Sequence, residues 1–143
     1  MMLSLQPVTD LAPFADLLRA SGLPADDLTQ PGRRFWRAVT GDGVTIGYGG
    51  LEGDGADVLL RSVVIDSRSR GSGSGRALVA LLLAEAKAGG ASKVWLLTLS
   101  AADFFRHLGF SVAARAAAPA AITTSQQFSA LCPASAQLLV TSV

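Results

Sequence analysis

A glycine-rich loop, Arg70-Gly71-Ser72-Gly73-Ser74-Gly75-Arg76, most limits what this chain can fold into. It lies between a predicted strand at 57–66 and a predicted helix at 75–88 that is apolar on nearly all sides and therefore buried. Three alternate glycines let the backbone approach a ligand closely and adopt positive φ. A helix N-terminus presents free N–H groups and a positive dipole end, which favour a phosphate. The loop therefore predicts a pyrophosphate site.

Two common phosphate-binding fingerprints do not fit the loop. The dinucleotide pattern G-x-G-x-x-G requires a third glycine where the sequence has Arg76 or Leu78, and a P-loop requires a lysine after the last glycine. The pattern R-x-x-G-x-G does fit, at Arg70, Gly73 and Gly75. The alternative is a surface turn that is glycine-rich by chance, and the flanking strand, buried helix and arginines argue against it.

Hydrophobic periodicity predicts an α/β protein with a mixed sheet. The apolar run at 94–99 is typical of an interior strand, and a right-handed βαβ crossover makes it parallel to the strand at 57–66. We expect a single domain, 1–143, whose central sheet has six to seven strands with helices on both faces. Further strands are predicted at 3–8, 33–40, 44–51, 110–115 and 136–140, and helices at 11–20, 75–88, 101–108 and 124–131.

Composition narrows the class of protein. A net charge of +1 gives no basic footprint for nucleic acid or an anionic membrane surface. The sequence contains no spanning-length apolar run and starts without a signal-peptide pattern, so we expect a cytoplasmic protein. His107 and the single cysteine, Cys132, fall short of a four-ligand zinc site, so no metal is expected. Cys132 is either a small packing residue or a thiol near the active site.

A second motif follows the strand at 94–99. The segment from Ala101 to Phe110 resembles the later motif A-x-x-F-Y-x-x-x-G-F of the GNAT superfamily of acetyltransferases, and R-x-x-G-x-G resembles the acetyl-CoA signature of the same superfamily. The two motifs together cover about 59–110. The resemblance implies the GNAT fold and an N-acetyltransferase. Its co-substrate would be acetyl-CoA, and a small-molecule amine would attack directly in a ternary complex.

The resemblance also implies where acetyl-CoA lies. The strand at 59–65 would part from the strand at 94–99, and the pantetheine arm would enter the opening. A backbone N–H near Val63 would polarise the acetyl carbonyl, as a fixed donor aimed at developing charge. The implied cofactor contacts are Val63, Val64, Ile65, Arg70, Gly71, Ser72, Gly73, Ser74, Gly75, Arg76 and Phe104.

A narrower resemblance spans about 44–139. The segments 50–52, 59–63, 96–98 and 128–136 are similar to a small group of bacterial GNAT proteins associated with arsenic-resistance genes. That group is similar to acetyltransferases acting on phosphinothricin and arsinothricin. It implies an acceptor that is an amino acid analogue with an extra anionic group.

The sequence departs from the family at two positions with expected chemistry. Many GNAT enzymes have a tyrosine general acid where this chain has Phe105, which cannot donate a proton. An asparagine common at the end of the preceding strand is Thr98 here. Because a thiol has a pKa near ~8.5, water can protonate the departing thiolate. Two alternatives stay open: a protein that binds acyl-CoA without turnover, and an acetyltransferase for protein N-termini or lysines.

Candidate residues for the amine substrate come from the strands before the loop. Glu52 is the best candidate for a general base, directly or through water, and the alternative is a solvated carboxylate. Arg61 is either a clamp for a substrate anion, with Ser62 and Phe105 as further substrate contacts, or a member of an internal ion pair with Asp57 or Glu52.

Two further expectations concern geometry. Period-two alternation predicts that Arg61 and Val63 share one face of their strand, which would look into the substrate cleft. The apolar last strand, at 136–140, offers an edge for a homodimer.

Overall fold

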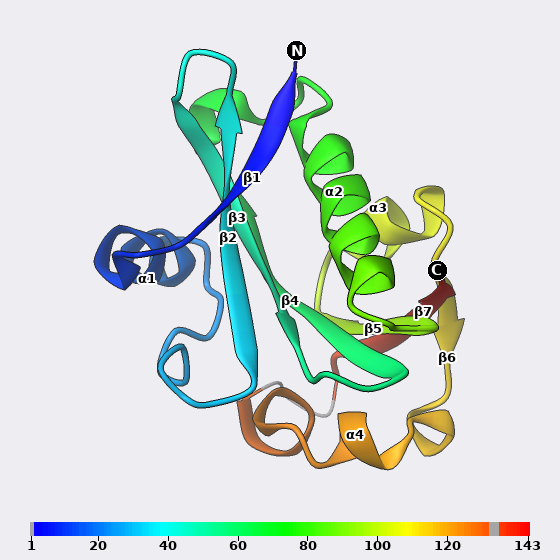
Figure 1. Ribbon diagram of the computed structural model, residues 1–143. Coiled ribbons are helices and arrows are strands. Elements are labelled where there is room, and N and C mark those ends of the chain that lie inside the picture. Colours follow the sequence, from blue (N-terminus) through cyan, green and yellow to red (C-terminus); the bar gives the residue numbers. More distant parts are fainter. Residues whose placement is uncertain (1, 132–134) are drawn as a thin grey trace.

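The computed structural model describes residues 2–131 and 135–143, which build a seven-stranded mixed sheet (Figure 1). The strand order is β1-β2-β3-β4-β5-β7-β6, and every neighbouring pair is antiparallel except β4–β5. This confirms the predicted fold class, at the upper end of its strand count. The strands are β1 (Leu3–Pro7), β2 (Arg33–Thr40), β3 (Thr45–Glu52), β4 (Asp57–Ile65), β5 (Lys93–Thr98), β6 (Ser111–Ala113) and β7 (Gln137–Ser142). Cys132 lies outside the described residues.

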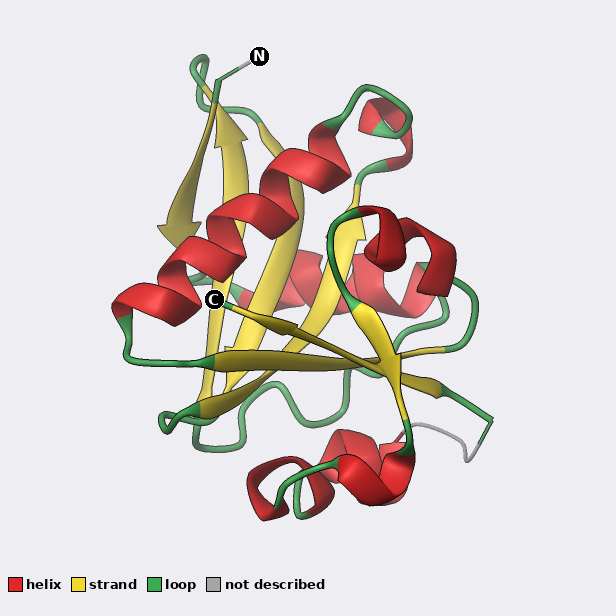
Figure 2. Ribbon diagram, turned by 90° about the vertical axis from the view of Figure 1, so that its right-hand side faces the viewer, coloured by secondary structure: helices red, strands yellow, loops and turns green. Residues whose placement is uncertain are grey.

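Helices cover both faces of the sheet. Helix α1 (Leu11–Ala20) packs on one face and α2 (Ser74–Ala88) on the other, while β5 and β7 cross at a steep angle to the first four strands (Figures 1 and 2). The shorter helices are α3 (Ala102–His107) and α4 (Ala120–Thr123). No helix within the described residues has the length and apolar character to cross a membrane.

The ends of α1 follow from its sequence. Asp10 is the N-cap, and its Oδ1 accepts a hydrogen bond from the N–H of Ala12 at 3.1 Å. Phe14 and Leu18, one turn apart, are fully buried against the sheet. The helix ends before Gly22, which has a φ of 72°.

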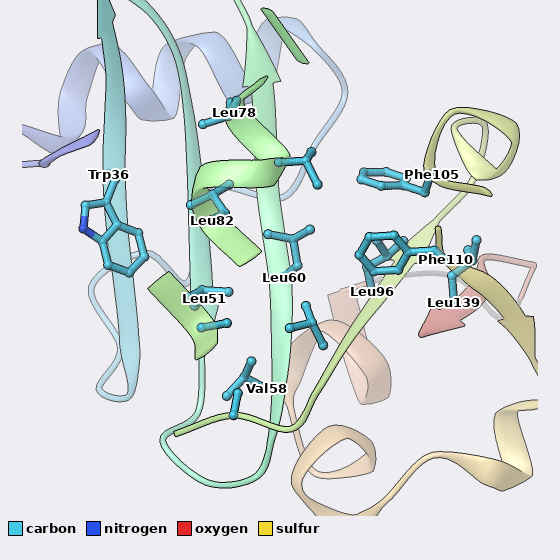
Figure 3. Close-up of a cluster of buried hydrophobic side chains, with 14 of the residues drawn as sticks. Trp36, Leu51, Val58, Leu60, Leu78, Leu82, Leu96, Phe105, Phe110 and Leu139 are labelled. Atoms are coloured by element: carbon cyan, nitrogen blue, oxygen red, sulfur yellow. The ribbon is translucent and has the colours of Figure 1, made fainter. Parts of the chain in front are cut away.

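The main core lies between α2 and the sheet (Figure 3). Leu78 and Leu82 of α2 are fully buried against Val58 and Leu60 of β4. Each fully buried leucine contributes roughly 1.5–3 kcal/mol relative to an exposed one. This packing fixes the start of α2 beside the end of β4, which is where the glycine loop lies.

The chain after α3 differs from the sequence prediction. The strand expected at 110–115 is only Ser111–Ala113. The helix expected at 124–131 is replaced by a turn at 124–125 and a π-helical turn at Gln127–Leu131, and α4 forms just before it, where no helix was predicted. The hydroxyl of Ser125 explains the break. Ser125 Oγ donates to the carbonyl of Ile122 at 2.6 Å and accepts from the N–H of Phe128 at 3.2 Å, so it competes with regular helix bonding.

The position of β7 overturns the expected dimer edge. This last strand pairs with β5 along one side and with β6 along the other. Both of its edges are therefore used within the chain. The edges of the sheet are β1 and β6, so the last strand cannot pair across a two-fold axis as expected.

Candidate active site

The only parallel pair of the described sheet, β4–β5, opens after three register pairs. These are Asp57 with Lys93, Val58 with Val94 and Leu59 with Trp95. Beyond Leu59, β4 runs on to Ile65, whereas β5 turns away from it (Figure 3). Strand β5 stays paired with β7 to its end. The register of the described strands gives β4 no further partner on this edge. The backbone polar groups at 60–65 that point to this edge therefore face an opening, as the family resemblance implied.

A β-bulge interrupts β4 inside this opening. Tyr48 pairs with Val64 and Gly50 with Arg61, so Ser62 and Val63 together lie opposite Gly49. Ser62 has a φ of 58° and is the one non-glycine residue with positive φ among those described. This left-handed conformation costs an L-residue roughly 1–2 kcal/mol. Backbone strain of this kind is concentrated at functional sites.

The bulge overturns the expected alternation of Arg61 and Val63. Val63 packs against the core under α2, together with Val58 and Leu60. Arg61 instead lies on the opposite face, where it contacts the ring of Phe35 at 5.6 Å. The prediction that they share a face is wrong because the bulge inserts one extra residue between them, which reverses the alternation.

The glycine loop follows at the carboxyl end of β4. Gly71 and Gly73 have φ values of 80° and 81°, and Gly73 is the left-handed N-cap of α2. A Cβ on Gly75 would lie 3.2 Å from Cζ of Phe104, so α3 closely approaches the first turn of α2. The predicted cofactor residues of the loop, the end of β4 and Phe104 are thereby brought together.

Side chains of the loop hold its turn in place. The Nε of Arg70 donates to the carbonyl of Ile65 at 3.1 Å, which ties the loop to the end of β4. Ser72 Oγ donates to the carbonyl of Ser69 at 2.7 Å and lies 2.8 Å from Ser74 Oγ. Arg70 and Arg76 are exposed beside the glycines, which leaves their charge accessible to an anion.

Arg61 is a member of an internal ion pair. Its side chain is 0% exposed, and its two terminal nitrogens donate to Oδ1 and Oδ2 of Asp27 at 2.5 Å each. Nη1 also donates to Oε1 of Glu52 at 2.9 Å. Of the two predicted partners, Glu52 is present, and Asp57 instead accepts from Nε1 of Trp95 at 2.8 Å. The charge of Arg61 is neutralised within the protein, so the ion-pair interpretation describes this residue.

Two further residues complete the cluster, and the sequence analysis did not single them out. Asp27, in the connector between α1 and β2, is 2% exposed and also accepts from Arg33 Nη2 at 3.0 Å. Arg33 Nη2 donates to Oε1 of Gln126 as well, at 2.9 Å. We call Asp27, Arg33, Glu52 and Arg61 the charge cluster. Asp27 is 34 positions from Arg61, and no local pattern marks this pairing.

The contacts within the cluster shift the pKa values of Asp27 and Arg61. Burial raises the pKa of Asp27, but hydrogen bonds and charge from Arg61 and Arg33 outweigh it, so the pKa lies below its ordinary value. Burial likewise lowers the pKa of Arg61, and Asp27 and Glu52 outweigh it in the opposite direction. Asp27 is therefore held as a carboxylate and Arg61 as a guanidinium cation.

Glu52 lies at the closed end of the opening. It pairs with Leu59, the last residue of β4 that is paired with β5. Three residues lie between Leu59 and Val63, so the Cα atoms of these two residues are roughly 10 Å or more apart along the strand. This spacing favours the predicted route through water over direct proton transfer to Glu52.

Thr98 and Phe105 have structural contacts. Thr98 Oγ1 accepts from the N–H of Ala101 at 3.0 Å and supports the turn before α3. Phe105 is 7% exposed and packs edge-to-face on Phe104 and on Phe110. Figure 3 shows the rings of Phe105 and Phe110. The ring of Phe105 borders the core and supplies no proton donor.

A small hollow lies beside the end of β4 on the α1 face. It has a volume of about 260 Å³. Its lining residues are Pro13, Leu17, Thr45, Ile46, Gly47, Tyr48 and Asp66. A larger, shallow hollow of about 770 Å³ lies between α3 and β6, away from the bulge. Among the described residues, no three His, Cys, Asp or Glu side chains are grouped so as to hold a metal ion.

Comparison with known proteins identifies a matching domain. A family model described as "Acetyltransferase (GNAT) domain" matches residues 31–112, which is more than half of the chain. No curated protein matches the sequence.

Solved structures share the architecture at low sequence identity. N-acetylglutamate synthase from Neisseria gonorrhoeae, complexed with coenzyme A and N-acetyl-glutamate, is 17% identical with a TM-score of 0.79, over 99% of this chain and 35% of that one. The chain thus spans about a third of that synthase. Rv2747 from Mycobacterium tuberculosis, in complex with CoA, is 20% identical with a TM-score of 0.77, over 98% and 99% of the two chains. An aminoglycoside 6'-N-acetyltransferase complexed with coenzyme A is 18% identical with a TM-score of 0.68, over 99% and 97%.

Proposed function

Because the chain belongs to the GNAT acetyltransferase family, we propose that it is an acetyl-CoA-dependent N-acetyltransferase for the amine of a small molecule. The observation that carries the proposal is the parting of β4 from β5 after Leu59, directly beside the glycine turn that begins α2. A free strand edge supplies backbone hydrogen bonds for an extended amide-containing arm. A helix N-terminus with accessible arginines supplies a place for a diphosphate.

The residues have distinct roles in this proposal. The pantetheine arm lies along the β4 edge at Val63, Val64 and Ile65, and the diphosphate lies on the N–H groups of the loop 70–76. The backbone at the bulge, near Val63, donates to the acetyl carbonyl oxygen and stabilises the charge that develops there. Phe104, which packs beside Gly75, lines the cofactor site.

The chemistry needs only modest help from side chains. The amine nitrogen attacks the thioester carbonyl carbon, the C–N bond forms, and the C–S bond breaks. The thiolate takes a proton from water, since Phe105 has none to give. The amine proton leaves to water, with Glu52 as a remote acceptor through a water chain. Holding the two reactants together then provides a large part of the rate enhancement.

The acceptor is proposed to be small. Two of the similar structures are, by their names, a synthase holding N-acetyl-glutamate and an aminoglycoside acetyltransferase. We therefore propose a small-molecule amine in the cytoplasm. Anionic amino acid analogues like phosphinothricin and arsinothricin are the first compounds to test.

Release of free coenzyme A thiol tests the proposal. Wild-type protein with acetyl-CoA is assayed against amino acids, phosphinothricin-like compounds, polyamines and peptides. Rapid thiol release with at least one small amine, and acetylation of its nitrogen by mass spectrometry, is the expected result. Release with peptides alone would support the protein acetyltransferase instead, and no release with any amine would overturn the proposal.

A matched pair of glycine variants tests the cofactor site. Gly73 and Gly43 both have a φ of 81°, and a Cβ on either would meet nothing within 4 Å. Gly43→Ala on the β2–β3 turn therefore carries the same backbone strain as Gly73→Ala without touching the loop. We expect Gly73→Ala to weaken acetyl-CoA binding at least tenfold in calorimetry and Gly43→Ala to leave it within about twofold. Equal affinities for acetyl-CoA in the two folded variants would show that the loop is not part of the cofactor site.

A further inference from the structure

The charge cluster lies directly beside the bulge, and we propose that it positions the bulge for catalysis. Arg61 precedes Ser62, and Arg61 Nε donates to Ser62 Oγ at 3.1 Å. In this proposal Arg61 is a positioning residue, which acts through Ser62 on the backbone that contacts the acetyl group. The inference rests on the proposed acetyl transfer for its kinetic consequences.

The first step is that Arg61 is held rigidly. Both oxygens of Asp27 accept from its two terminal nitrogens, a forked arrangement that fixes the plane of the guanidinium group. Glu52 accepts from the same group at 2.9 Å, and the ring of Phe35 lies 5.6 Å from it. No part of this side chain is exposed. Its Nε–H therefore points in one direction, toward Ser62.

The second step is that β3 is shaped to admit this arrangement. Gly50 lies between Phe35 and Arg61 in the sheet register. A Cβ on Gly50 would lie 2.4 Å from Cδ1 of Phe35, so any larger residue would displace the ring. The missing side chain lets Phe35 and Arg61 meet across β3.

The third step links the rigid side chain to the backbone. Ser62 has the strained φ of 58°, and the bond from Arg61 holds its hydroxyl on the face of the charge cluster. With Ser62 fixed in this way, the chain reverses its alternation and Val63 faces the α2 core. The backbone of the bulge is then presented toward the opening where β5 has turned away.

Stability alone does not explain why the chain has this charge cluster. Replacing a buried ion pair by apolar residues of similar volume is often neutral or stabilising, so buried ion pairs are weak evidence for a purely stabilising role. A strained bulge beside a fully satisfied charge cluster, at the point where the two strands part, is what a positioning role requires.

Asp27→Asn tests the proposal, with Asp57→Asn as its control. Both remove one carboxylate charge, but Asp57 lies at the closed end of β4, where it accepts from Trp95. We expect Asp27→Asn to lower kcat at least tenfold and to leave the affinity for coenzyme A without its acetyl group within about twofold. Asp57→Asn should change kcat by less than about twofold. An unchanged kcat in folded Asp27→Asn would overturn the proposal.

A rescue experiment separates positioning from general destabilisation. Glycine adopts positive φ without help from a neighbouring side chain. Adding Ser62→Gly to Asp27→Asn should therefore restore kcat at least threefold when both variants are assayed well below their Tm values, where loss of folded protein does not limit kcat. A folded double variant without recovery would overturn the role of Ser62.

If Asp27→Asn does not fold, Ser62→Ala replaces it as the test. This variant removes only the hydroxyl that Arg61 holds, and an unchanged kcat in Ser62→Ala would overturn the proposal.

Binding measurements keep the inference distinct from the proposed function. If wild type acetylates no amine, the proposed function fails, and the ratio of the Kd values for coenzyme A and acetyl-CoA is compared instead. A bulge positioned for the acetyl group predicts that this ratio falls at least threefold in Asp27→Asn. An unchanged ratio would overturn the positioning role.

Discussion

The carboxylate of Asp27 is buried between two guanidinium groups, and its ionisation therefore links folding to pH. Its pKa is lower in the folded state than in the unfolded chain, because Arg61 and Arg33 outweigh the effect of burial. A depressed folded-state pKa gives stability that is fully present above the unfolded value, close to ~3.9, and is lost as the pH falls through the folded value.

Asp27→Asn should accordingly destabilise the protein in a pH-dependent way. Breaking a buried pair by removing one partner costs about 3–5 kcal/mol, which we expect at pH 7. The difference from wild type should shrink as the pH falls below ~4, because the unfolded chain takes up a proton on Asp27 there and folded wild type does so at still lower pH. Urea unfolding at several pH values measures this difference. Asp103→Asn is the control, since its side chain is 88% exposed. A difference that stayed constant down to pH 2 would contradict the assigned ionisation.

Single residues also show where inference from sequence stops. Arg61 was recognisable as a charge in an apolar strand that needs a partner, and Glu52 was among the partners predicted. Asp27 was not predictable, because only the folded connector brings it to Arg61. The shared face of Arg61 and Val63 was predicted wrongly, because period-two alternation assumes a strand without a bulge.

At the scale of elements, the fit of β3 under α2 depends on a glycine. A Cβ on Gly49 would lie 2.4 Å from Cδ1 of Leu82, which is fully buried and cannot turn aside easily. We expect Gly49→Ala to destabilise the protein by about 1–3 kcal/mol through overpacking. Gly55→Ala is the matched control, since its Cβ would meet nothing within 4 Å. Equal stability of the two variants in urea unfolding would show that α2 can shift at no cost.

The elements themselves were largely predictable, and the reason differs between the two halves of the chain. The strand–loop–helix–strand unit through α2 carries strong periodicity and glycine punctuation, so its order, direction and glycine turn were confirmed. After α3 the sequence is rich in alanine and hydroxyl residues. There, hydrogen bonds from side-chain hydroxyls, such as those of Ser125, interrupt the helix that was predicted at 124–131. Hydrophobic periodicity carries no information about these local bonds.

For the whole molecule, the one parallel strand pair of the described sheet has the largest consequence. A crossover through α2 makes β4 and β5 parallel, and β7 then holds β5 on its far side while β4 continues alone. The opening was predicted from family resemblance. The insertion of β7 between β5 and β6 was not, because a connector of more than twenty residues separates those last two strands.

Binding in this opening should stabilise the whole chain, since a ligand that binds only the folded state opposes global unfolding. At a hundredfold excess over Kd the gain is about 2.7 kcal/mol. For a chain of this size about 3 °C of Tm corresponds to 1 kcal/mol, so acetyl-CoA should raise Tm by ~8 °C.

S-acetyl-pantetheine at the same concentration is the control, because it carries the acetyl group and the pantetheine arm but no diphosphate. It can use the β4 edge and not the loop, so its shift should be below ~2 °C. Calorimetric melting of wild type with each compound measures the two shifts. Equal shifts would mean that the glycine loop holds no diphosphate, and the anion site at the start of α2 would have to be abandoned.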